Sequence, residues 1–257
     1  MDLHHVLGGD GEPLLLIQGM SGTHLSWGEE FLSALHDDFQ TVSYDHRGIG
    51  LSPAANDPFT IKDLAEDAAG LLDALGWESA HVLGISMGGM VAQELALAHP
   101  DRIRTLTLGC TFCGGPGSQL TPQETMAKLG AAMTSGDREE AIRVGYEVNV
   151  SAEFRAQAAH YENFRAMALA APAKVATIML QMQACLAHDT HDRLPQITAP
   201  TLVLHGREDQ MLPAANGELI ASLVPGASLE LWDGVGHMFW WEQPELSAGA
   251  LKDHILG

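Results

Sequence analysis

The sequence predicts an α/β domain: a mostly parallel central sheet with helices on both faces and an inserted helical lid. Two observations support this. Short apolar runs alternate with longer Ala- and Leu-rich runs along most of the 257 residues, as in proteins built from strand–helix–strand units. Most of the short runs also lack a strict alternation of apolar and polar residues, which is typical of parallel strands covered on both faces.

The short runs are expected to form six strands, at residues 14–18, 41–45, 81–85, 104–108, 201–205 and 228–232. Residues 61–75 carry an apolar stripe at helical spacing. Residues 87–98 follow a strand directly and end before Pro100, where proline prevents continuation of a helix. The helices expected at 213–223 and 244–255 both open with proline, which is tolerated in a first helical turn.

Residues 114–195 interrupt this alternation. Glycines and a proline open the region, and Pro195 and Pro200 bracket its exit. Only helical patterns occur inside it, at residues 122–134, 138–149, 152–167 and 173–188. We therefore expect a helical lid at 114–195, set into an α/β core formed by residues 1–113 and 196–257.

Charge and composition exclude several classes of function. The chain has 13 Lys and Arg against 33 Asp and Glu, a formal net charge of −20. Such a surface repels nucleic acids and anionic membranes. No apolar run approaches the roughly 18–20 residues of a membrane span, and residues 1–5 lack the features of a secretory signal. Three cysteines are too few for a disulfide framework. We expect a cytoplasmic protein with no nucleic-acid partner and no membrane span.

The strongest motif is Gly84-Ile85-Ser86-Met87-Gly88, which lies between an expected strand and an expected helix. This is the context of a nucleophile elbow, a sharp turn that lifts a serine hydroxyl above the sheet. Glycines at both ends of the motif remove side chains that would collide in such a turn. The Met87 amide, at the start of the helix, is placed to stabilise a developing oxyanion.

A reactive serine needs a base and a third group that orients the base. Asp209 and His237 each follow one of the last two expected strands. The carboxyl ends of parallel strands share one edge of a sheet, so both residues can meet Ser86 there. Glu208 and Asp233 are alternative carboxylates for the orienting role.

With these motifs the chain resembles the α/β-hydrolase fold family over nearly its whole length. Residues 15–20 match the family's oxyanion-loop strand, and residues 45–52, Asp-His-Arg-Gly-Ile-Gly-Leu-Ser, match its D-x-R-G-x-G-x-S turn. The resemblance implies Asp209 as the acid, because of its offset after the preceding strand, and the Met20 amide as the second oxyanion donor. The family usually has His-Gly where this chain has Gln18-Gly19, so the hydrogen bonds that shape this loop are expected to differ.

Within the family, the Ser86 motif and the small lid resemble esterases, 3-oxoadipate enol-lactonases and cofactor-free haloperoxidases. The expected activity is hydrolysis of a carboxylic ester, with lactones and thioesters as variants, through an acyl-enzyme and without a cofactor. With an ordinary pKa for His237, activity falls below about pH 6–7. Carbon–carbon bond hydrolysis, haloperoxidase or perhydrolase chemistry, and non-catalytic binding of a small molecule are the alternatives.

Apolar side chains flank the motifs and favour an apolar small-molecule ester as the substrate. Trp27, Met211 and Met238 are the candidates for contacting it, because thioether side chains adapt to irregular apolar shapes. No group of His, Cys and carboxylate residues has the spacing of a complete metal ligand set. No phosphate-binding glycine loop occurs in a suitable context. We therefore expect no metal and no cofactor.

Overall fold

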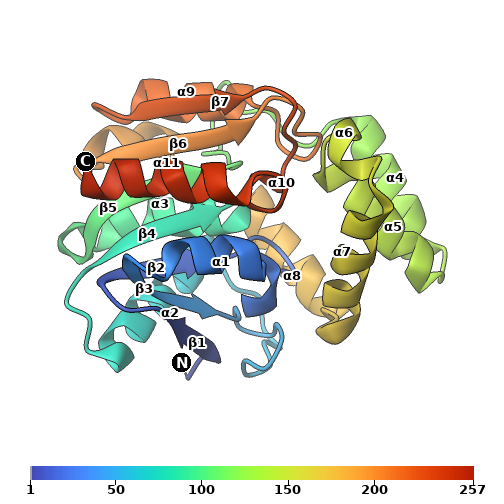
Figure 1. The fold of residues 1–257 in the computed structure, drawn as a ribbon, viewed down its shortest axis with the longest axis horizontal. Coiled ribbons are helices and arrows are strands. Elements are labelled where there is room, and N and C mark those ends of the chain that lie inside the picture. Colours follow the sequence, from blue (N-terminus) through green and yellow to red (C-terminus); the bar gives the residue numbers. More distant parts are fainter. Residues whose placement is uncertain (1) are drawn as a thin grey trace.

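A seven-stranded sheet forms the centre of the computed structural model, which describes residues 2–257 (Figure 1). The strand order is β1-β3-β2-β4-β5-β6-β7. Neighbouring strands from β3 to β7 run parallel, and β1 pairs antiparallel with β3 at the edge. The strands are β1 (His5–Gly8), β2 (Glu12–Ile17), β3 (Phe39–Tyr44), β4 (Ala80–Ile85), β5 (Ile103–Gly109), β6 (Thr201–Gly206) and β7 (Ser228–Trp232). Met1, the first residue of the expected core segment, lies outside the described residues.

Helices cover both faces of this sheet. Helices α1 (Glu29–Leu35) and α11 (Pro244–Leu256) lie on one face, whereas α2 (Ile61–Leu75), α3 (Met87–Ala98) and α9 (Ala215–Leu223) lie on the other (Figure 1). The buried apolar side chains form two large clusters, one under each helical layer. Strands β2 to β6 are buried along most of their length, which explains the missing alternation. The predicted α/β architecture is confirmed.

Local sequence sets the bounds of α2. The Thr60 hydroxyl accepts a hydrogen bond from the Asp63 amide at 3.2 Å, and the Asp63 carboxylate accepts one from the Thr60 amide at 2.7 Å. This reciprocal capping box satisfies two amides that a helix start otherwise leaves unpaired. Gly76 ends the helix with a φ of 70°, a left-handed conformation that glycine adopts without strain.

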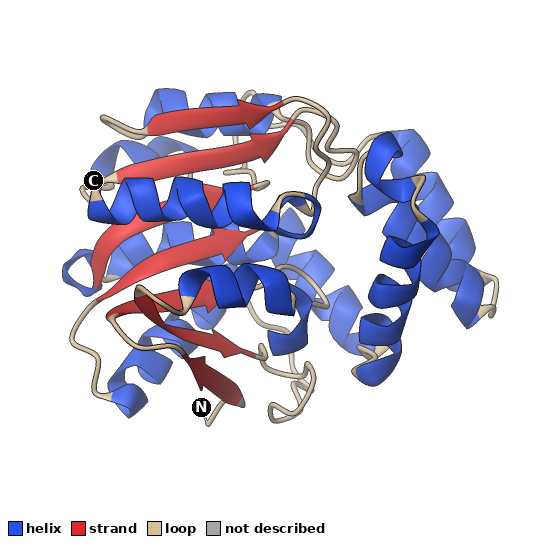
Figure 2. Ribbon diagram, viewed as in Figure 1, coloured by secondary structure: helices blue, strands red, loops and turns tan. Residues whose placement is uncertain are grey.

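The segment between β5 and β6 contains only helices among its regular elements. They are α4 (Gln123–Thr134), α5 (Arg138–Asn149), α6 (Ala152–Arg155), α7 (Ala158–Ala170), α8 (Val175–Leu186) and the 3₁₀ helix η3 (His191–Gln196). In Figure 2, helices α4 to α8 gather beyond the arrowheads of the parallel strands. No single described helix is long and apolar enough to cross a membrane, and the one pair that meets those criteria together, α7 with α8, is bent by 103°.

A bidentate ion pair holds the return of this segment to the core. The two terminal nitrogens of Arg193 in η3 donate to the two carboxylate oxygens of Glu94 in α3, at 2.7 and 2.6 Å. Glu94 is buried, so the paired guanidinium offsets the cost of removing its charge from water. The base of the inserted segment is therefore fixed to the helix that follows the Ser86 turn.

Three features differ from the sequence-based expectation. Strand β1 is additional: its Val6 and Leu7 are exposed, as an edge strand allows, so no buried pattern marks it. Helix α1 is also additional. A single helix at 152–167 is wrong, because α6 ends at Arg155 and α7 begins at Ala158. At this break the ring of His160 stacks on that of Phe154, with ring centroids 3.8 Å apart.

Candidate active site

A strained turn at Ser86 joins β4 to α3. Ser86 has φ 53° and ψ −123°, a conformation that side-chain-bearing residues rarely adopt. A Cβ atom on Gly84 would lie 2.2 Å from the Gly88 carbonyl oxygen, and one on Gly88 would lie 2.0 Å from the Ile17 carbonyl oxygen. Glycine is therefore required at both positions, and the chain has the tight geometry of a nucleophile elbow at Ser86.

The last residue of β5 and the residues after it hold this turn from the adjacent strand. The Ser86 amide donates to the Gly109 carbonyl at 2.9 Å, and the Thr111 hydroxyl donates to the Ser86 carbonyl at 2.6 Å. Cys110 lies between these two contacts, fully buried and with a φ of 40°. Two positive-φ residues thus lie side by side at the carboxyl ends of β4 and β5, and hydrogen bonds between the strands stabilise both.

Asp209 and His237 form a buried pair at the ends of β6 and β7. Their Oδ2 and Nδ1 atoms are 2.7 Å apart. The other oxygen of Asp209 accepts the backbone amides of Met211 at 2.7 Å and Leu212 at 2.9 Å. The turn after β6 therefore fixes the carboxylate, and the carboxylate fixes the imidazole with its Nδ1 protonated.

The two alternative carboxylates lie elsewhere. Glu208 is exposed and accepts the backbone amide of Ala152 in the inserted segment at 3.3 Å. Asp233 is exposed and pairs with Arg207 at 2.9 Å. Asp209 is thus the carboxylate that contacts His237.

Sequence reasoning missed His205, which is fully buried at the end of β6. Its Nε2 atom lies 3.1 Å from Asp209 Oδ2 and 2.8 Å from the Leu212 carbonyl oxygen. Both neighbours are acceptors, so Nε2 carries the hydrogen and shares it between them. Asp209 therefore receives hydrogen bonds from two histidines as well as two backbone amides. The available signal was the position of His205 four residues before Asp209, at the strand end that leads into the acidic turn.

Cys110 lies near both the histidine and the serine. Burial raises the pKa of the Cys110 thiol, whereas the nearby His237 ring and Ser86 backbone amide lower it. Among residues 2–257, the Ser86 hydroxyl makes no hydrogen bond to the His237 ring. Such bonds are often long before substrate binds. The ring thus lies beside the turn, with a thiol as its contact in this conformation.

Burial and charge shift the pKa values of Asp209 and His237 in opposite directions. Burial raises the pKa of Asp209, but the charge of His237 and the hydrogen bonds from His205 and His237 outweigh it and hold that pKa at about 2. Burial lowers the pKa of His237, but the charge of Asp209, together with the contact to Cys110, raises it well above the ordinary 6.5. The condition of an ordinary His237 pKa, on which the expected loss of activity below about pH 6–7 depended, is therefore not met, because the buried carboxylate favours the imidazolium.

The loop after β2 lies against the serine. A Cβ atom on Gly19 would lie 3.5 Å from Ser86 Oγ. Among the described residues, neither the Met20 amide nor the Met87 amide has an acceptor within the protein. Both of the expected oxyanion donors are therefore unoccupied. The side chain of Gln18, which stands where the family usually has histidine, accepts the Gly19 amide at 3.1 Å.

The three residues proposed to contact substrate lie in different surroundings. Trp27 and Met238 are buried in the apolar cluster under α1 and α11. Met211 is half-buried and packs on a small cluster from the inserted segment that includes Val144 and Val148. Of the three, Met211 is therefore the one that joins the acidic turn to the inserted segment.

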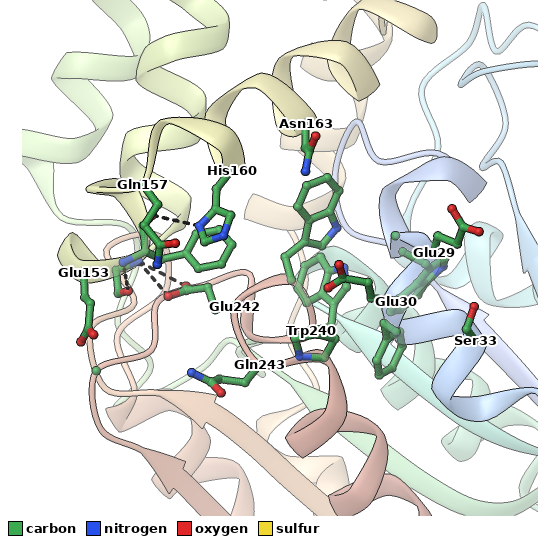
Figure 3. A pocket seen from close by; sticks show the side chains of 18 of the residues that line it. Glu29, Glu30, Ser33, Glu153, Gln157, His160, Asn163, Trp240, Glu242 and Gln243 are labelled. Carbon is green, nitrogen blue, oxygen red and sulfur yellow. Dashed lines mark hydrogen bonds between the residues drawn. The ribbon is translucent and has the colours of Figure 1, made fainter.

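A cleft of about 910 Å³ opens between α1, α6, α7 and the residues around α10 (Phe239–Glu242) (Figure 3). Trp27 and Trp240 contribute to its wall, but Ser86 and His237 do not. Its lining has five carboxylates and no lysine or arginine. The buried Glu242 among them accepts the backbone amides of Gly236 and Ser151, which ties the loop before His237 to the inserted segment.

One group of described side chains has the composition of a metal site. The ligand atoms of His4, His24 and Asp45 lie within 4.8 Å of one another. The Asp45 carboxylate, however, already accepts the amide and ring nitrogens of His24 at 2.8 and 2.9 Å and the Leu51 amide at 2.9 Å. N–H donors thus occupy both oxygens, and the group fits a hydrogen-bonded support for the 45–52 turn better than a cation site.

Known proteins share this architecture and much of this sequence. The model of the family described as alpha/beta hydrolase fold matches residues 12–244. The relative named "Putative carbamate hydrolase RutD" from Azorhizobium caulinodans is 31% identical, over 95% of this chain and 91% of its own. The crystal structure of a hydrolase from Pseudomonas aeruginosa PA01 is 32% identical, with a TM-score of 0.85 over 99% of this chain and 94% of its own. A thermophilic esterase from Thermogutta terrifontis is 28% identical, with a TM-score of 0.80 over 98% and 92% of the two chains.

The buried pair predicts how stability depends on pH. The folded-state pKa of Asp209, about 2, lies below the ordinary 3.8 of an aspartate, so its contribution of ~2 kcal/mol is present above about pH 4 and is lost as the pH falls toward 2. The pKa of His237 is raised, so its contribution is present below about pH 6.5 and is lost at higher pH. Urea unfolding from pH 2.5 to 6 should show that Asp209→Asn removes most of the acid-side loss. The matched control Asp233→Asn, at an exposed carboxylate, should leave the wild-type profile unchanged.

Proposed function

Because the chain belongs to the alpha/beta hydrolase fold family, we propose that this hydrolase uses Ser86, His237 and Asp209 to cleave carboxylic esters through an acyl-enzyme. The observation that carries the proposal is the buried 2.7 Å pair of Asp209 and His237, which lies beside a strained serine turn. A carboxylate paired with an imidazole, beside a serine, provides the parts that nucleophilic acyl transfer needs.

In the first half-reaction, Ser86 Oγ attacks the ester carbonyl carbon while His237 Nε2 takes the hydroxyl proton. The carbonyl oxygen becomes an oxyanion. The bond to the leaving alcohol then breaks, and the imidazolium returns its proton to that alcohol. In the second half-reaction a water molecule attacks the acyl carbon and gives a proton to His237, which releases the acid and restores the Ser86 hydroxyl.

Asp209 acts on His237 throughout these steps. Its Oδ2 atom accepts the Nδ1 proton, which leaves Nε2 as the basic nitrogen, and its charge stabilises the imidazolium that forms. The hydrogen bond from His205 keeps the carboxylate ionised and oriented without contacting the substrate. His205 is therefore a positioning residue for the acid.

The Met20 and Met87 amides supply the electrostatic part of the mechanism. Both are backbone donors without acceptors in the described structure, and one of them starts a helix that follows the serine directly. Removing one such donor typically costs about 10²–10³ in turnover. Before the attack, the His237 ring exchanges its contact with Cys110 for one with the Ser86 hydroxyl.

The substrate we propose is an uncharged ester with an apolar acyl or alcohol group. Met211 supports this, because it lies between the acidic turn and the apolar face of the inserted helices. The strong negative charge of the chain also disfavours anionic substrates. The 28% identity to an esterase over almost the whole chain agrees with this class.

Carbamate hydrolysis is the second candidate, and one observation favours it. The chain is 31% identical to the RutD relative over 95% of its length. A carbamate carbonyl is attacked by the same serine, base and oxyanion donors, so the geometry of the site serves both reactions. The substrate that the pocket selects distinguishes them.

Covalent labelling tests the nucleophile. A fluorophosphonate probe should label the wild-type protein once, at Ser86, because only an activated serine attacks phosphorus at a useful rate. Ser86→Ala should abolish labelling and lower kcat by at least about 10³-fold. Intact-protein and peptide mass spectrometry measure both the extent and the position. Ser118→Ala is the matched control, and labelling that persists in Ser86→Ala would place the nucleophile elsewhere.

The raised pKa of His237 sets the pH dependence of the reaction. His237 must lose its proton to act as a base, so the acid limb of kcat/KM should have its midpoint above pH 6.5. Asp209→Asn removes the charge that favours the imidazolium, and the midpoint should then move to lower pH while kcat falls about 10²–10⁴-fold. Steady-state rates from pH 5 to 9 measure both. A midpoint that stays fixed in Asp209→Asn contradicts the assigned base.

A matched substrate series distinguishes the two candidate functions. The kcat/KM of p-nitrophenyl esters should rise from acetate to hexanoate, by up to about 10-fold per methylene that the site buries, and should exceed that of the matched N-alkyl carbamates. The acid-terminated succinate ester should be slower than butyrate. Carbamates that outpace their matched esters would establish the second candidate, and a faster succinate ester would rule out an apolar pocket.

A further inference from the structure

A long-range hydrogen bond joins the oxyanion loop to the inserted segment. The Ser21 amide donates to the side-chain oxygen of Gln181 in α8 at 2.9 Å, across 160 residues of sequence. Ser21 directly follows Met20, the residue whose amide is the proposed second oxyanion donor. Ser21 also has a φ of 63°, a left-handed conformation that a serine keeps only when its surroundings hold it.

The burial and orientation of the Gln181 side chain suit it to bind this amide. Its side chain is fully buried, although the Ser21 residue that it binds is exposed. A backbone N–H bonds only to an acceptor, so the Gln181 amide cannot reverse its orientation. Its nitrogen has no partner among the described residues, so a contact to the nitrogen does not explain the orientation of the side chain.

Helix α8 gives Gln181 a rigid base. One turn earlier, Thr177 is buried against the 45–52 turn, where a Cβ atom on Gly48 would lie 2.8 Å from its methyl group. One turn later, Ala184 is part of the apolar cluster of the core. The face of α8 that presents Gln181 is therefore packed on the core, although the chain of α8 belongs to the inserted segment.

A second glutamine holds the same loop from its other side. The Gln18 side-chain oxygen accepts the Gly19 amide at 3.1 Å, and the Gln18 carbonyl accepts the ring of His46 at 2.9 Å. The amides on either side of Met20 are thus both bound to buried glutamine oxygens. The Met20 amide between them is the one left without an acceptor.

We propose that Gln181 is a positioning residue that sets the direction of the Met20 amide by fixing Ser21, so that the inserted segment completes the oxyanion hole. This inference rests on the proposed function. Gln181 does not contact the reacting atoms. It acts because a carbonyl oxygen that becomes an anion gains most from a donor whose direction is already set. Without Gln181, Ser21 can leave its strained conformation and turn the Met20 peptide away.

The test compares Gln181→Met with the wild type. Methionine keeps the length and burial of the side chain but offers only a weak acceptor. We expect kcat for a p-nitrophenyl ester and the rate of fluorophosphonate labelling to fall by about 10-fold, part of the 10²–10³ that a lost donor costs. KM should stay within about twofold, since the substrate pocket is untouched. The midpoint of the pH profile should not move, since the His237–Asp209 pair is untouched.

Thr177→Val is the matched control. It removes a buried hydroxyl from the same face of α8, one turn away, and leaves the bond between Gln181 and Ser21 in place. Its labelling rate should equal that of the wild type. An equal loss in both variants would show that α8 acts only through packing, and labelling of Gln181→Met within twofold of the wild type would also overturn the proposal.

Hydrogen exchange tests the contact independently of activity. The Ser21 amide should exchange slowly in the wild-type protein despite the exposure of that residue. It should remain protected in Gln181→Glu, which keeps an acceptor oxygen. Fast exchange in the wild type would overturn the inference even if Gln181→Met failed to fold. Absence of wild-type labelling at Ser86 would instead refute the proposed function, while slow exchange would still establish the contact.

Discussion

The arrangement of the site depends on one buried carboxylate, Asp209, and on the neighbouring groups that donate hydrogen bonds to it. Asp209 is fully removed from water, so its charge is tolerated only because two backbone amides and two imidazoles donate to it. Those donors come from the turn after β6, from β6 itself and from the loop after β7. The parallel sheet is what brings the three together, because the carboxyl ends of its strands share one edge. The same edge carries Ser86, so the contacts that satisfy the carboxylate also hold the imidazole at the edge where the serine lies.

Around Ser86, the geometry of the site is set by backbone conformation rather than by charge. Ser86, Cys110 and Ser21 all have positive φ without being glycine; Ser86 and Cys110 follow the adjacent strands β4 and β5, and Ser21 lies in the loop after β2, the other neighbour of β4. Each donates its backbone amide to an acceptor in a neighbouring element: Ser86 to Gly109, Cys110 to Leu204 and Ser21 to Gln181. Strain of this kind persists only where the surroundings determine the conformation. Its concentration here indicates a region whose geometry is set in advance of binding.

The site residues that could be predicted from the sequence are those whose neighbours in the sequence indicate their role. The glycines around Ser86, the acidic turn that contains Asp209 and the glycine-flanked His237 each carry their signal within a few residues. Cys110 and Gln181 carry none, because their importance comes from contacts with residues far away in the chain, whereas His205 carries only its position four residues before Asp209. Strand β1 was missed for a related reason: an exposed edge strand buries too little to leave an alternating pattern. The raised pKa of His237 could not be predicted either, since the buried charge of Asp209 that raises it comes close only on folding.

The position of α8 divides the inserted segment into two parts with different freedom to change. Helices α4 to α7 extend beyond the sheet, where they can vary in length and composition to suit different molecules (Figure 1). Helix α8 belongs structurally to the core, through Thr177, Gln181 and Ala184. A chimera that takes a relative's segment up to residue 174 therefore keeps the native support of the loop at Met20. One that also replaces α8 exchanges the helix that holds the Ser21 amide together with the rest of the inserted segment.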